Sequence, residues 1–137
     1  MSKQLRNSLT LVNAVRQILV NNGISNDDSK LVHYKCTFKR KSYHFVIYGL
    51  FEMPLIIKTA YSESFNSNQA DRYPEQIQTI KELRLGQIWF VFDGFGFGHP
   101  SYRRCNRKIR RKIGRDNVFH IRELAQKILD IKKASQN

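Results

Sequence analysis

The chain has 137 residues, 41% hydrophobic and 12% aromatic, which suits one packed domain and excludes a disordered tail. It carries 24 Lys and Arg against 11 Asp and Glu, and a domain with a net charge of +13 is expected to bind polyanions. Its longest apolar runs, such as Phe45–Tyr48, are far too short to span a bilayer, so no membrane partner is expected.

The N-terminal segment Met1–Asn7 is polar and shows no signal-peptide pattern. Only two cysteines occur, Cys36 and Cys105, and we expect them to be reduced thiols of an intracellular protein, in the cytoplasm or nucleoid. Two cysteines cannot form a zinc site alone, and the four histidines show no ligand spacing. The sequence therefore predicts no metal site of the zinc kind.

Apolar spacing predicts a first helix over residues 8–22, with Ser8 as its N-cap and Gly23 closing its end. The period then changes from that of a helix to that of a strand. Alternation of apolar and polar residues predicts half-buried strands over Val32–Phe38 and Tyr43–Tyr48.

A third, more buried strand is predicted over Pro54–Tyr61, with its proline at the start, where no ladder donor is needed. The Ser- and Asn-rich residues 62–70 are predicted to form a loop. A second helix is predicted over Arg72–Arg84, with Asp71 as a cap candidate and Pro74 near its first turn.

The nearly continuous apolar run Gln87–Phe92 is typical of a strand buried on both faces. A glycine-rich loop, Asp93–Pro100, follows it. A short strand over Asn117–His120 and a final helix that carries Ile121–Ile131 complete the chain, and Lys132–Asn137 is expected to fray.

This order of elements predicts an α/β fold in one domain spanning residues 1–137, with a mixed central sheet of about four or five strands flanked by helices. Trp89 is expected in the core. The glycine-rich loop lacks the spacing of a P-loop or a dinucleotide site, and we expect Phe95 and Phe97 to pack down rather than stack on bases.

The segment Arg103–Arg115 is the most informative in the chain, because eight of its thirteen residues are Lys or Arg and none is acidic. Cys105, Ile109 and Ile113 recur every four positions, which places them on one face of a helix and the cations on the others. So many like charges repel each other unless a polyanion such as a nucleic-acid backbone lies opposite them. A solvated basic helix with no partner is the alternative.

We predict that nucleic-acid phosphates are bound mainly by the cations of this helix, assisted by a basic hairpin tip and a loop histidine: Arg103, Arg104, Arg107, Lys108, Arg110, Arg111, Lys112 and Arg115, with Lys39, Arg40, Lys41 and His99. If about six to eight of these engage phosphates, affinity falls by about three to five orders of magnitude between about 50 and 200 mM salt.

Three stretches carry a resemblance to a known family: Pro54–Ser62, Asn68–Tyr73 and Ile88–Phe97. They look like the third strand, the entry to the next helix and the Asp-Gly-terminated strand of type II restriction endonucleases. The chain thus resembles the PD-(D/E)XK nuclease superfamily over roughly residues 43–125. The resemblance implies a restriction-endonuclease-like core (αβββαβ), duplex DNA as the favoured target, and a homodimer or a larger catalytic partner.

Members of that superfamily hold magnesium with an Asp on the second strand and a Glu on the third, and a Lys two positions after the Glu assists the attacking water. Here His44 stands where the Asp would be. If Lys58 matches the family lysine, the carboxylate position is Ile56; one position later, Ile57 and Thr59 take these places. We therefore predict a DNA-binding protein whose catalytic carboxylates are missing or displaced, with no cofactor.

Two alternatives stay open. Displaced acids at Glu52, Glu63, Glu75 or Asp93 would make the chain an active magnesium-dependent endodeoxyribonuclease of the restriction or junction-cleaving type. Its candidate catalytic residues are Lys58, His44, Glu52 and Glu75. The simpler interpretation makes Glu52 and Asp93 turn residues, Glu63 a loop residue and Glu75 a helix N-terminal acid. The third possibility is an RNA-binding or ribosome-associated protein, because a basic helix reads phosphate charge and not the sugar.

Overall fold

The computed structural model describes the backbone of residues 3–25, 29–35, 41–63 and 67–135, and the side chains of 10–25, 44–63, 69–94, 96–100 and 102–134. Helices and strands follow in the order α1 (Lys3–Asn21), β1 (Ser29–Lys35), β2 (Lys41–Ile47), β3 (Leu55–Tyr61), α2 (Ser67–Glu82), β4 (Gln87–Asp93), α3 (Ser101–Ile113), β5 (Val118–His120) and α4 (Leu124–Ser135). Three short 3-10 turns join the later elements: η1 (Phe95–Gly98), η2 (Arg115–Asn117) and η3 (Ile121–Glu123).

The strands form one sheet of five in the order β1-β2-β3-β4-β5. β2 is antiparallel to both of its neighbours, whereas β3, β4 and β5 are parallel. The mixed central sheet predicted from the sequence is therefore confirmed. The parallel pairs are joined by helical crossovers, as parallel strands require.

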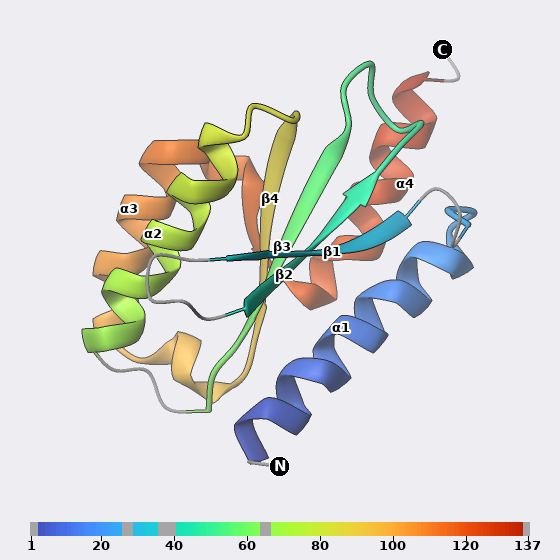
Figure 1. The fold of residues 1–137 in the computed structure, drawn as a ribbon. Coiled ribbons are helices and arrows are strands. Elements are labelled where there is room, and N and C mark those ends of the chain that lie inside the picture. The colour runs from blue at the N-terminus through green and yellow to red at the C-terminus, as the bar shows by residue number, and fades with distance from the viewer. Residues whose placement is uncertain (1–2, 26–28, 36–40, 64–66, 136–137) are drawn as a thin grey trace.

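Helices cover both faces of this sheet (Figure 1), with α2 and α3 on one face and α1 and α4 on the other. Side chains of β4 alternate between the two layers: Ile88 and Phe90 enter the α2/α3 core, and Trp89 and Val91 enter the α1/α4 core. The prediction that this strand is buried on both faces, with Trp89 in the core, is confirmed.

The first helix is longer than predicted, because it begins at Lys3 and includes Ser8 as an interior residue. Residues 3–7 contain no Gly or Pro, and most are good helix formers, so nothing stops the helix at the serine. Its predicted end is confirmed. Gly23 has a φ of 84°, and the Ile24 N–H donates to the Leu19 carbonyl over 2.9 Å, which is the Schellman pattern.

The second helix also begins earlier than predicted, at Ser67, so the expected loop over 62–70 is wrong for its last four residues. Asp71 is an interior residue and not a cap, and Pro74 lies inside the helix rather than in its first turn. The reason is tertiary: Gln69 and Ala70 are 2% and 4% exposed, so packing against the sheet holds a polar segment in the helix.

The C-terminal tail was expected to fray, but α4 continues to Ser135. Lys132 anchors it, because its ammonium group donates a hydrogen bond to the backbone carbonyl of Asn22 after α1. The glycine-rich loop contains η1, and Phe97 packs down as predicted, with its ring centroid 4.9 Å from that of Phe92. The Phe95 side chain and Cys36 lie outside the described residues.

Candidate nucleic-acid interface

The apolar stripe of α3 points into the protein, as its four-residue spacing predicted. Cys105 and Ile109 are fully buried, and Ile113 packs at the margin of the same α2/α3 core. Burial raises the pKa of the Cys105 thiol to about 12, so this sulfur stays protonated and unreactive at neutral pH. The stripe fixes which sides of α3 its cations occupy.

One row of cations on α3 faces α2 and has partners within the protein. Asp71 on α2 is shared by Arg104, at 3.5 Å, and Lys108, at 3.2 Å. The Lys112 ammonium donates a hydrogen bond to the Gln78 side-chain oxygen over 2.8 Å. Of the eight cations predicted to bind phosphate, these three are therefore engaged with α2, at least in part.

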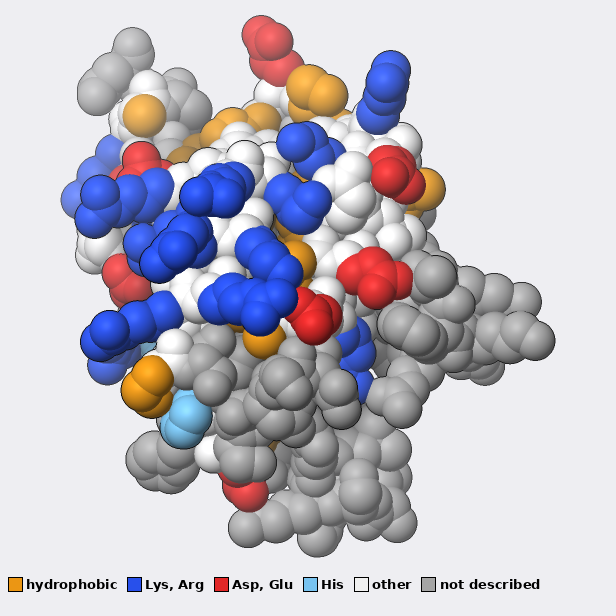
Figure 2. Space-filling model, turned by 90° about the vertical axis from the view of Figure 1, so that its left-hand side faces the viewer, with side chains coloured by type: hydrophobic (Ala, Val, Ile, Leu, Met, Phe, Trp, Pro, Cys, Tyr) orange, Lys and Arg blue, Asp and Glu red, His pale blue; other side chains and the backbone are white. Residues whose placement is uncertain are grey.

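The other five arginines lie on the solvent side of α3 and at η2, where they line an open hollow of about 490 Å³. We call this surface the arginine groove; its residues are Arg103, Asn106, Arg107, Arg110, Arg111 and Arg115. All five arginines are exposed, and none forms an ion pair with another described residue. Figure 2 shows Lys and Arg side chains gathered on this face of the molecule.

In the described part of the chain, none of the other residues predicted to contact phosphate lies in this groove. Lys39 and Arg40 of the expected hairpin tip lie outside the described part of the chain, and only the backbone of Lys41 is described. His99 is exposed and lies just before α3, where its carbonyl accepts the Tyr102 N–H.

A buried polar cluster lies between the sheet and α2, at the place where the resemblance puts its catalytic groups. His44 on β2 pairs in register with Lys58 on β3, and the two residues are 1% and 7% exposed. Nearby along the chain, the buried Ser62 hydroxyl donates to Gln69 over 3.2 Å. The contact between Ser62 and Gln69 was not predicted from the sequence. The signal that could have indicated it is a polar residue within a segment that packs against the sheet.

The environment of this cluster favours uncharged groups. Burial, and then the charge of Lys58, lower the pKa of His44 from 6.5 to about 4, so its imidazole is neutral at neutral pH. Ile56 alternates with Lys58 on the same face of β3, opposite Val46, and both aliphatic side chains are buried. The position two residues before Lys58, which the resemblance would assign to a carboxylate, thus holds a buried aliphatic side chain that cannot ligate a cation.

The four candidate acids do not gather at one point. Glu52 precedes β3 and Glu63 follows it, and a seven-residue strand separates its ends by about 20 Å. Glu52 is an exposed turn residue and Glu63 a loop residue that accepts from the Tyr61 hydroxyl, as expected. Glu75 is not a helix N-terminal acid, because α2 begins eight residues before it. Among the described residues, no three His, Cys, Asp or Glu side chains come close enough to hold a metal ion.

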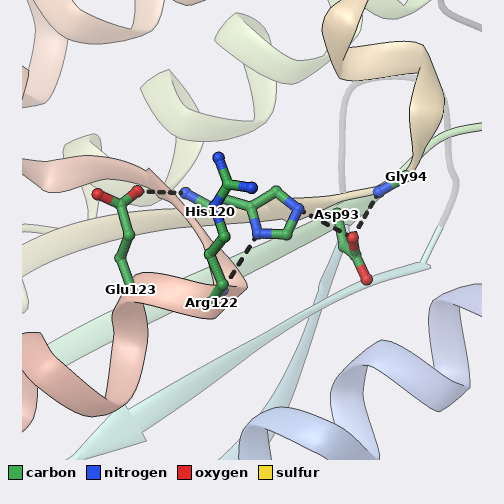
Figure 3. A network of polar contacts seen from close by, with 5 residues as sticks. All are labelled: Asp93, Gly94, His120, Arg122 and Glu123. Carbon is green, nitrogen blue, oxygen red and sulfur yellow. Dashed lines mark hydrogen bonds and ion pairs between the residues drawn. The ribbon is translucent and has the colours of Figure 1, made fainter.

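Asp93, the fourth acid, belongs to a polar network that joins the ends of β4 and β5 (Figure 3). Its carboxylate accepts the Gly94 N–H over 2.8 Å, which is the predicted turn contact, and lies 3.0 Å from Nε2 of His120. The Nδ1 atom of His120 accepts the Arg122 N–H, so the imidazole proton lies on Nε2 and points at Asp93.

The same network caps η3, because Glu123 accepts the His120 backbone N–H over 3.1 Å. Both ring nitrogens of His120 are thus occupied within the protein, and the network tethers two strands. The sequence did not predict it, since the contact depends on the parallel register that sets Phe92 beside His120.

In the described part of the chain, no helix has the length and apolar character needed to cross a membrane. Comparison of the chain with protein-family models, with curated proteins and with solved structures finds no match.

Proposed function

We propose that this protein binds nucleic acid, with duplex DNA as its ligand, through the arginine groove of α3. The observation that carries the proposal is that five exposed arginines line one hollow without an ion pair to any other described residue. Like charges held together on one helix face repel each other, and a phosphate backbone relieves that repulsion. Arginine also matches phosphate with a two-pronged hydrogen-bonding fork.

The five arginines of the groove set the expected salt dependence. Five phosphate contacts give a slope of about −4.5 for the logarithm of the association constant against that of the salt concentration. Affinity then falls by about 500-fold between about 50 and 200 mM salt. This is smaller than the fall expected from all eight cations, because three of them are engaged with α2.

The scaffold is proposed to be a restriction-endonuclease-like core that binds without cutting. The observed order of one helix, three strands, a helix and a strand agrees with the αβββαβ order that the resemblance implies. The buried Ile56 beside Lys58 supports the proposal that the catalytic carboxylates are missing. The homodimer or larger catalytic partner that the resemblance implies stays a prediction, and light scattering with and without DNA tests it.

Replacing Arg107 and Arg110 with Gln is expected to weaken duplex binding about 60-fold at about 0.1 M salt and to reduce the salt slope by about two. The physical reason is that two phosphate contacts, and the counterions they displace, are lost. Fluorescence anisotropy on a labelled duplex across a salt series measures both quantities.

The matched control replaces Lys81 and Lys133, two exposed lysines of α2 and α4, with Gln. It removes the same net charge away from the groove and should leave the slope within about half a unit of wild type. Equal losses in the two variants would mean that overall charge, and not the groove, binds the ligand.

Supercoiled plasmid incubated with the protein and either Mg²⁺ or Mn²⁺ is expected to stay intact. Cleavage needs carboxylates that converge on a metal ion, and no three His, Cys, Asp or Glu side chains converge among the described residues. Gel electrophoresis of the plasmid checks this. Metal-dependent nicking that disappears when Glu52, Glu63, Glu75 or Asp93 is replaced would overturn the proposal in favour of an active endonuclease.

A further inference from the structure

The side of α3 that faces α2 carries both of its lysines together with Arg104, whereas the cations on its solvent side are arginines alone. The helix has two lysines, Lys108 and Lys112, and both face α2, where they have partners. The cations on its solvent side are all arginines: Arg103, Arg107, Arg110 and Arg111. An ammonium group and a guanidinium group carry the same charge, so attraction to a polyanion alone does not account for this separation. What distinguishes arginine is its planar fork, which pairs with two acceptors at once.

Asn106 also lines the hollow. Its side-chain oxygen is buried without a hydrogen-bond partner among the described residues, so this acceptor is not presented to a base edge. The groups of the groove that suit the reading of base edges are therefore the guanidinium groups of its five exposed arginines.

The dimensions of α3 fit the major groove of B-form DNA. Its 13 residues make a rod about 20 Å long and, with side chains, about 10–12 Å in diameter. The major groove is about 12 Å wide and admits one helix. α3 lies at the outer side of the molecule beside α2 (Figure 1). Asp71, the acid of α2 that contacts α3, is paired with two cations, so it does not oppose a phosphate backbone there.

We propose that α3 enters the major groove of duplex DNA and that Arg103, Arg107 and Arg110 read guanine edges there. This inference rests on the proposed function and deepens it, because it names B-form DNA as the ligand and base edges as part of the contact. The O6 and N7 atoms of guanine present two acceptors to one guanidinium fork. A-form RNA does not offer this contact, because its major groove is too deep and narrow for side chains to read.

The test compares one guanine-rich duplex with the same duplex carrying 7-deazaguanine, which lacks the N7 acceptor but keeps its base pairing and charge. Wild-type protein is expected to bind the modified duplex at least about tenfold more weakly at equal salt, with the same salt slope. The triple variant Arg103→Lys, Arg107→Lys and Arg110→Lys keeps every charge and should bind both duplexes equally. The control variant Arg84→Lys and Arg122→Lys, outside α3, should retain the wild-type preference.

The outcomes separate this inference from the proposed function. Equal binding of both duplexes by wild-type protein, with a steep salt slope, would overturn major-groove reading and leave phosphate binding in place. A flat salt slope would instead remove the proposed function itself. Binding to an A-form RNA duplex as tight as to DNA at equal salt would also overturn the inference, in favour of RNA binding.

Discussion

Replacing Gly94 with Ala is expected to lower the free energy of unfolding by about 4 kcal/mol, because the added methyl group meets both a strained backbone conformation and a close backbone neighbour. Gly94 has a φ of 108° and a ψ of 155°, a region that only glycine adopts readily. A Cβ at this position would lie 2.1 Å from the backbone carbonyl oxygen of Ser62. Backbone atoms cannot move aside as the end of a flexible side chain can.

The consequences reach both candidate sites. The Ser62 carbonyl accepts the Gly96 N–H over 2.9 Å, and the Ser62 N–H donates to the backbone carbonyl of Asp93 over 3.1 Å. Displacing this backbone would disturb the buried Ser62–Gln69 contact on one side and η1, which leads into α3, on the other. The close approach of Gly94 thus sets the start of the basic helix relative to the sheet.

Two other glycines serve as matched controls in urea unfolding followed by circular dichroism. Gly114 has nearly the same backbone conformation, φ 96° and ψ 150°, but a Cβ there would meet only a side-chain nitrogen at 3.3 Å. Gly114→Ala should cost about 1–2 kcal/mol. Gly98→Ala has open space and should cost less than about 0.5 kcal/mol. If Gly94→Ala cost no more than Gly114→Ala, the close contact with Ser62 would be refuted.

The parts of the fold with strong periodic signals were predictable from sequence. The continuous apolar run of β4 and the four-residue apolar spacing of α3 each specify burial without reference to the rest of the chain. The start of α2 was not predictable in this way. Its first residues are Ser and Asn, which favour turns locally, and only burial of Gln69 and Ala70 against the sheet makes them helical.

The candidate site shows the same division between local and tertiary information. The four-residue spacing of Arg104, Lys108 and Lys112 places them on a different side of α3 from the other cations, and a helical projection of the sequence reveals this. Which side faces α2 depends on packing between segments more than thirty residues apart. The number of cations in Arg103–Arg115 can thus be counted from the sequence, whereas the tertiary structure determines that five of them form no ion pair with another described residue.

His44 is expected to make the protein less stable as the pH falls from about 6.5 to about 4. Its pKa is lowered from 6.5 in the unfolded chain to about 4 in the native protein, first by burial and then by the charge of Lys58. Above pH 6.5 both states hold the neutral imidazole, and its contribution to stability is complete. Between the two pKa values only the unfolded state binds the extra proton, so protonation favours unfolding.

The expected loss from this one residue is about 3 kcal/mol once the pH reaches about 4, because each unit of pKa difference corresponds to about 1.4 kcal/mol. Urea unfolding of wild type and of His44→Phe at a series of pH values isolates it. The variant lacks the proton-binding group, so its stability should fall less steeply over this range, even if it is less stable at pH 7. Parallel curves for the two proteins would contradict the burial of His44.

Replacing Lys58 provides a second test of this environment, because a general loss of packing would not produce the expected change in the His44 pKa. Burial is the larger cause of the lowered His44 pKa and Lys58 the smaller, so Lys58→Met should move that pKa upward without restoring it to 6.5. Titration of the imidazole by NMR in wild type and in this variant reports the shift directly. An unchanged His44 pKa would mean that the two side chains do not share one buried face of the sheet, and the position assigned to the family lysine would have to be reconsidered.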